Sequence, residues 1–128
     1  MSDAERVIDP ETQVELLVPS WATPESVVRR EALKREGLLR RIRFWNEWGH
    51  AWPLWEDYPI EPDELGLSAE LSRALKTWHL YWEDNCSPFT GWKLEGQAAE
   101  WEARGDVLFE WTCRETWNSV ELVAQYTP

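Results

Sequence analysis

Hydrophobic residues recur with helical spacing in the second half of the chain. After Ser68, which can cap a helix, apolar side chains follow at intervals of four, three and four residues: Leu71, Leu75, Trp78 and Trp82. This spacing places them on one side of a helix, where they form a stripe that can be buried. The pattern therefore predicts a helix that begins near Ser68 and ends near Asn85.

A second stripe predicts another long helix, roughly from Leu94 to Thr116. Its members are Leu94, Ala98, Trp101, Gly105, Leu108 and either Trp111 or Thr112. Glycine in an exposed helix costs about 1 kcal/mol relative to alanine, so Gly105 on the buried side indicates close approach to another element. The two predicted helices can pair as an αα-hairpin.

The first part of the chain carries shorter patterns. Residues 13–18 are apolar and partly β-branched, which is typical of a strand. The Thr-Pro-Glu sequence at 23–25 marks a helix start, and Gly37 can end that helix. We therefore predict a polar helix from residue 24 to about residue 36, and we expect residues 1–11 to form a mobile terminus.

Residues 38–46 fit two kinds of element. Leu38 and Ile42 share one side of a strand with Phe44, but they also share one side of a helix with Trp45. The glycine that precedes the segment disrupts a helix more than a strand, so we favour the strand.

The remaining patterns complete a small mixed fold. Residues 120–126 alternate as in a half-buried strand, whereas three prolines make residues 47–66 an irregular connection. The order of elements predicts an α+β fold, with a small sheet of two to three strands covered on one face by two or three helices. The length of 128 residues fits a single domain over residues 1–128.

Charge narrows the class of partner. The chain has 24 acidic and 13 basic residues and a net charge of −11, which should repel nucleic acids and anionic membranes. No run approaches the roughly 18 apolar residues of a membrane helix. The N-terminus lacks the features of a signal peptide, and two cysteines do not make a disulfide framework, so we expect a cytoplasmic protein.

Two stretches resemble those of known small proteins. One is WPLWED at residues 52–57, and the other is GLSAEL at residues 66–71, followed by Leu75 and Trp78. Together they resemble small proteins of actinobacteria and their phages with a WPLW…LSxELxxxLxxW pattern. The resemblance extends loosely over residues 52–126 and implies no activity, because that family has none assigned.

Tryptophan is unusually abundant, with 11 residues, and four of them lie close together at positions 45, 48, 52 and 55. Tryptophans in such a cluster either anchor a protein interface or fill the core beneath the loop. Acidic residues follow the cluster, and they could orient a basic partner. The candidate partner-binding residues are Trp48, Trp52, Trp55, Glu56, Asp57, Asp63 and Glu64.

The residue pattern gives little support for catalysis or metal binding. Paired acids such as Glu56 and Asp57 could serve a glycoside hydrolase, but adjacent acids on a loop are usually solvated. His79 and Glu83 could share a metal ion one helical turn apart, but no further ligands follow at zinc-site spacing. There is no nucleophile or phosphate-binding motif. We therefore expect no catalytic residues, no metal and no cofactor.

The acidic surface and the tryptophans lead to one functional prediction. We expect a non-enzymatic module, similar in design to an inhibitor or immunity protein, that binds another, basic protein. The alternative is a small-ligand or carbohydrate-binding domain that uses the same Trp-rich loop. The oligomeric state stays open.

Overall fold

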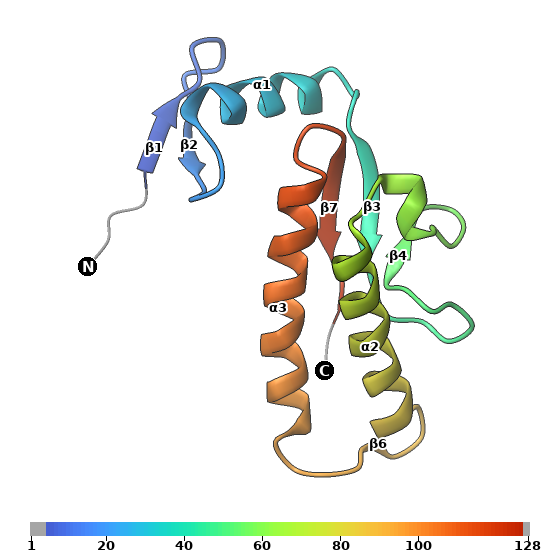
Figure 1. Ribbon diagram of the computed structural model, residues 1–128. Coiled ribbons are helices and arrows are strands. Elements are labelled where there is room, and N and C mark those ends of the chain that lie inside the picture. Colours follow the sequence, from blue (N-terminus) through green and yellow to red (C-terminus); the bar gives the residue numbers. More distant parts are fainter. Residues whose placement is uncertain (1–4, 127–128) are drawn as a thin grey trace. The chain divides into compact units, whose positions relative to one another are not determined.

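The computed structural model describes residues 5–126 and consists of two compact units, residues 1–40 and residues 41–128 (Figure 1). The first unit contains a hairpin of β1 (Glu5–Ile8) and β2 (Glu15–Val18), followed by α1 (Pro24–Arg35). The strands are antiparallel, with Glu5 opposite Val18. Thr23 and Ser26 begin α1 with a reciprocal capping box, at the position where the Thr-Pro-Glu sequence predicts a helix start.

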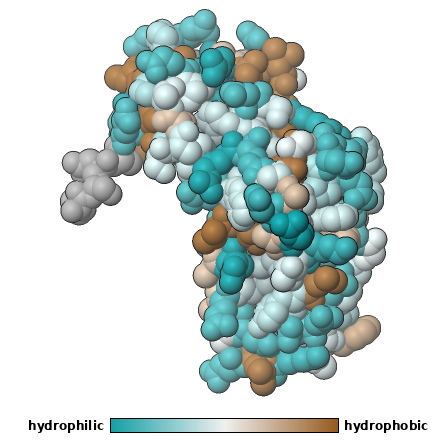
Figure 2. Space-filling view, in the orientation of Figure 1, coloured by the Kyte–Doolittle hydropathy of each residue, from teal (hydrophilic) through white to brown (hydrophobic). Residues whose placement is uncertain are grey.

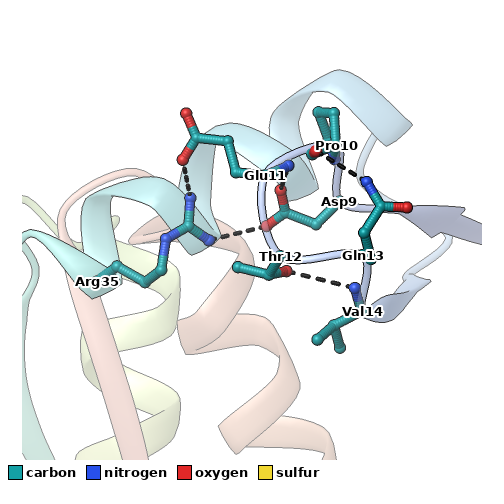
Figure 3. Close-up of polar contacts among 7 residues, drawn as sticks. All are labelled: Asp9, Pro10, Glu11, Thr12, Gln13, Val14 and Arg35. Atoms are coloured by element: carbon teal, nitrogen blue, oxygen red, sulfur yellow. Dashed lines mark hydrogen bonds and ion pairs between the residues drawn. The ribbon is translucent and has the colours of Figure 1, made fainter.

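A buried carboxylate ties the hairpin loop to the last turn of α1 (Figure 3). Asp9 is 1% exposed and accepts hydrogen bonds from the Glu11 backbone N–H at 2.9 Å and from Arg35 at 2.8 Å. Arg35 also pairs with the Glu11 carboxylate at 2.9 Å. The Glu11 N–H, together with Arg35, holds the pKa of Asp9 below its ordinary value. This contact joins β1, the loop and α1 within the first unit.

The second unit is built on a three-stranded sheet in the order β4-β3-β7. Its strands are β3 (Arg40–Phe44), β4 (Leu54–Trp55) and β7 (Val120–Ala124). β3 and β4 are antiparallel, with Phe44 opposite Leu54, whereas β3 and β7 run in the same direction (Figure 1). The sheet is therefore mixed, and the chain between β3 and β7 contains both helices of this unit.

Two long helices cover one face of this sheet (Figure 1). α2 (Ala69–Asn85) begins at the Ser68 cap, and α3 (Gln97–Glu115) returns beside it. A short hairpin of β5 (Cys86–Ser87) and β6 (Gly91–Trp92) connects them, and a 3₁₀ helix, η1 (Pro62–Leu65), precedes α2. The helices and the sheet enclose one hydrophobic core: Ile42, Phe44, Leu54, Ile60, Leu71, Leu75, Trp78, Trp101, Leu108, Val120 and Leu122.

The structure confirms the α+β class, the three helices and the strands expected at 13–18, 38–46 and 120–126. The sheet that two helices cover has three strands, in agreement with the predicted size. Residues 5–8 of the expected mobile terminus are paired in β1, and residues 1–4 lie outside the described part of the chain. The single domain over residues 1–128 stays a prediction beside the two compact units.

Two expected core positions are wrong for reasons of helix capping. Leu38 is 63% exposed because it completes the C-terminal cap of α1, where its N–H bonds to the Leu33 carbonyl and Gly37 is left-handed. Leu94 is 67% exposed because α3 begins only after Gly96, which has a φ of 87°. Both residues match the periodicity but lie just before the observed elements, β3 (Arg40–Phe44) and α3 (Gln97–Glu115).

Candidate functional site

The Trp loop, residues 45–58, connects β3 to the segment before η1 and contains β4. It is folded back on itself. The Ile60 N–H bonds to the Leu54 carbonyl at 2.9 Å, and the His50 ring bonds to the Ile60 carbonyl at 2.9 Å. The Glu56 N–H bonds to the Tyr58 carbonyl at 3.0 Å. Residues 56–58 therefore form the tip of a tight return, which sequence reasoning described only as an irregular connection.

Trp48 is the most exposed of the three candidate anchors. Its side chain is 42% exposed, and its ring centroid lies 4.8 Å from that of Trp82 on α2. Its backbone N–H donates to the Glu47 carboxylate at 3.0 Å. Trp82 therefore supports one side of an indole that remains partly open to solvent.

The side chain of Trp52 is used mainly for contacts within the protein. Its indole N–H donates to the Ser72 carbonyl at 2.8 Å, and its half-buried ring packs against the core. The Lys76 ammonium lies 5.4 Å from the centre of the ring. These contacts fasten the Trp loop to α2, so a substitution of Trp52 would change the loop itself.

Trp55 is half-buried among other rings. Its centroid lies 6.1 Å from that of Trp45 and 5.3 Å from that of His50. The guanidinium of Arg43 lies 5.2 Å from the centre of the Trp45 ring. Trp45, His50 and Trp55 thus form an aromatic cluster beside the sheet edge, and much of the Trp55 surface is used there.

The candidate acids differ in their local roles. Asp57 and Asp63 are exposed, and neither has an ion pair among the residues that the structure describes. Glu64 accepts a hydrogen bond from the Glu61 N–H at 2.7 Å, which closes the start of η1. Glu56 is half-buried, and its backbone carbonyl accepts from Arg43 at 2.9 Å. Asp57 and Asp63 are therefore the acids that can contact a partner without losing an ion pair within the protein.

Tyr58 is an exposed aromatic residue that sequence reasoning did not select. Its side chain is 52% exposed at the tip of the return, next to Asp57. The signal in the sequence was the Asp-Tyr-Pro order, because aspartate and proline are both frequent in turns, and turns lie at the surface. Over α2 and α3, Figure 2 shows mostly hydrophilic side chains, with hydrophobic ones in small separate groups.

His79 has partners within the protein on both ring nitrogens. It is fully buried, with Nδ1 lying 3.1 Å from the Asn46 amide nitrogen and Nε2 lying 2.7 Å from a Glu83 carboxylate oxygen. Burial lowers the pKa of His79, although Glu83 acts in the opposite direction. A neutral ring satisfies both contacts, since Asn46 then donates to Nδ1 and Nε2–H donates to Glu83.

The described part of the chain has neither a cluster of metal-ligating side chains nor a helix that could span a membrane. Among residues 5–126, no three His, Cys, Asp or Glu side chains are grouped as metal ligands. Within the same residues, every helix is too short or too polar to cross a membrane. No family model, curated protein or solved structure matches the chain. The resemblance to actinobacterial and phage proteins therefore stays a prediction.

Proposed function

We propose that the protein is a small cytoplasmic binding module, of the inhibitor or immunity type, that docks a basic protein partner. The docking surface would comprise the exposed aromatic and acidic side chains of the Trp loop and η1. Its members are Trp48, Asp57, Tyr58 and Asp63, which we call the acidic aromatic surface.

One observation carries this proposal: Trp48 is partly exposed, yet its ring is already held against Trp82 at 4.8 Å. Tryptophan is enriched among the residues that dominate protein–protein binding energy. An aromatic ring that is ordered before binding loses little conformational entropy when a partner covers it. Trp48 is therefore better suited to anchor a partner than Trp52 or Trp55, which are half-buried.

Charge supports a basic partner. Residues 41–128 contain 16 acidic and 7 basic residues, a net charge of −9. Such a field speeds the encounter with a basic protein and repels nucleic acids. The exposed Asp57 and Asp63 would provide short-range contacts to lysine or arginine side chains.

The alternative function, a small-ligand or carbohydrate-binding domain, has less support at this loop. Sugar binding by tryptophan needs an open ring face. Trp52 and Trp55 offer little of their rings to a ligand, because both are half-buried against other side chains. Trp48 alone would leave a carbohydrate with one stacking surface.

The first experiment is an affinity pull-down with the tagged protein from a nuclease-treated lysate of its source organism. Mass spectrometry identifies the captured protein, and the purified pair is then titrated at low and high salt. We expect a basic partner bound with one-to-one stoichiometry, with an affinity that falls as salt screens the acidic surface.

Matched variants then test the surface on the purified pair. Trp48→Ala should weaken binding at least about tenfold, since a central aromatic anchor is worth about 2 kcal/mol or more. The double reversal Asp57→Lys/Asp63→Lys should have a similar effect, because it places like charges against a basic partner. Phe89→Ala, at a residue 94% exposed in the β5–β6 hairpin, and Glu102→Lys/Glu110→Lys on α3 are the controls. Equal effects of test and control variants would contradict the proposed surface.

A further inference from the structure

A groove of about 1010 Å³ runs between α2 and α3, and no residue of the acidic aromatic surface lines it. Trp78 and Trp101 lie at its base, since both line it and are only 4% and 2% exposed. Their rings are stacked, with centroids 4.5 Å apart and an angle of 7° between the planes. Tyr81 and Val107, which are 38% and 61% exposed, form part of its walls.

The base of the groove is closed by the two tryptophans and offers no indole donor, whereas the exposed apolar surface belongs to the walls at Tyr81 and Val107. The Trp78 N–H donates to the Trp101 carbonyl at 2.8 Å, and the Trp101 N–H donates to the Trp78 carbonyl at 3.4 Å. Gly105 makes this arrangement possible, because a Cβ there would lie 2.5 Å from the Trp78 ring. An occupant would therefore gain mainly from burial of its own apolar surface against the walls of the groove.

The charged side chains that line the groove have a net positive charge. Arg73 on α2 and Arg104 on α3 both line it and are exposed, and neither forms an ion pair within the described part of the chain. Glu100 is the acidic residue among the lining side chains. The lining thus has a net charge of +1, although residues 41–128 as a whole carry −9.

We propose that this groove binds a small amphipathic anion, with an apolar body between Tyr81 and Val107 and an acidic headgroup near Arg73 and Arg104. Guanidinium groups form charge-assisted hydrogen bonds with carboxylates. The volume of the groove lies at the upper end of the range for drug-sized ligands. The inference does not depend on the proposed function, because the two sites share no residue.

The preference for an anion can be tested with ligands that share one apolar chain. Bound 1-anilinonaphthalene-8-sulfonate, a fluorescent amphipathic anion, is displaced by decanoate or decyltrimethylammonium below their micelle concentrations, or by decanol below its solubility limit. We expect decanoate to displace the probe at a concentration about tenfold lower than the other two ligands. One charge-assisted hydrogen bond accounts for about this difference in affinity. The net charge of −11 favours the cationic ligand. A preference for decanoate would therefore reflect the side chains of the groove and not the net charge of the molecule.

Variants locate the binding site. Arg73→Gln/Arg104→Gln should abolish the preference for decanoate, whereas Lys93→Gln/Arg114→Gln removes the same charge elsewhere and should retain it. Ala103→Trp fills the groove and should prevent probe binding, whereas Ala99→Trp, on an exposed position of α3 outside the lining, should not. Circular dichroism and thermal melting check that each variant is folded.

Three results would overturn the inference. The first is equal displacement by all three ligands, which would leave only apolar adsorption. The second is probe binding that persists in Ala103→Trp, which would place the probe elsewhere. The third is concentration-dependent dimerisation that Ala103→Trp abolishes, because a second copy of the chain would then be the occupant.

Discussion

Three tryptophans hold the fold through their indole N–H groups, whereas a fourth is available to a partner. Trp52, Trp78 and Trp101 each donate to a backbone carbonyl of another segment, so they join elements as well as fill space. Trp48 instead rests on Trp82 with 42% of its side chain exposed. At the scale of the residue, function is thus expected where the ring is ordered by a neighbour but not enclosed.

Gly105→Ala should destabilise the protein although alanine favours a helix. The new Cβ would lie 2.5 Å from Trp78 and 3.0 Å from Tyr126, so rings in the core must shift. Overpacking of this kind costs about 1–3 kcal/mol, more than the roughly 1 kcal/mol that alanine contributes to the helix. Urea unfolding measures the difference.

A double-mutant cycle provides the control for Gly105. If the indole of Trp78 causes the strain, Gly105→Ala should cost less in a Trp78→Phe background, where the ring is smaller. An equal cost in both backgrounds would mean that the strain arises elsewhere.

His79 should make the fold sensitive to mild acid. Its pKa in the folded protein is lowered by burial, whereas in the unfolded chain it returns to about 6.5. As the pH falls below about 6.5, His79 binds a proton in the unfolded state but not in the folded state, so the free energy of unfolding decreases. Urea unfolding at several pH values between about 5 and 8, where most carboxylates stay ionised, measures this slope.

Two variants assign the acid sensitivity. His79→Gln is less stable at neutral pH, but its free energy of unfolding should vary less between pH 5 and 8. His50→Gln, which leaves His79 in place, should retain the slope. An unchanged slope in His79→Gln would rule out His79 as the group responsible.

At the scale of the element, one carboxylate joins the end of α3 to the beginning of α2. Glu115 accepts hydrogen bonds from the Ser68 N–H and hydroxyl at 2.6 Å each, and from the Trp111 indole at 2.8 Å. Ser68 in turn caps the Leu71 N–H at 3.2 Å. Although burial acts against it, this hydrogen bonding with Ser68 holds the pKa of Glu115 below its ordinary value.

Glu115→Gln should lower the free energy of unfolding by about 1 kcal/mol, since an amide nitrogen replaces one of the accepting oxygens. Glu110→Gln makes the same charge change at an exposed position of α3 and should have almost no effect. Thermal and urea unfolding compare the two variants. Equal stabilities would mean that water replaces the Ser68 contacts without loss.

The elements that periodicity predicted are those long enough to have a period. α2 and α3 contain 17 and 19 residues, and their stripes are evident in the sequence. β4, β5 and β6 have two residues each, which cannot show an alternation. Their pairing depends on contacts such as Cys86 opposite Trp92, which local sequence does not specify.

At the scale of the whole molecule, charge is divided unevenly between the two units. Residues 1–40 carry 8 acidic and 6 basic residues, whereas residues 41–128 have a net charge of −9. The second unit also contains both proposed sites, which have opposite local charge. At physiological ionic strength the screening length is about 8 Å, so Arg73 and Arg104 can favour an anion locally while the unit attracts basic proteins at longer range.

The sequence by itself determined the fold class, the three helices and the acidity, because these depend on local periodicity, capping residues and composition. It could not distinguish Trp48 from Trp52, since four clustered tryptophans look alike until the loop folds back on α2. Nor could it show that Arg73 and Arg104, 31 positions apart, line one groove. The tertiary structure decided both, because side-chain exposure and the meeting of distant residues arise only when helices and loops pack against each other.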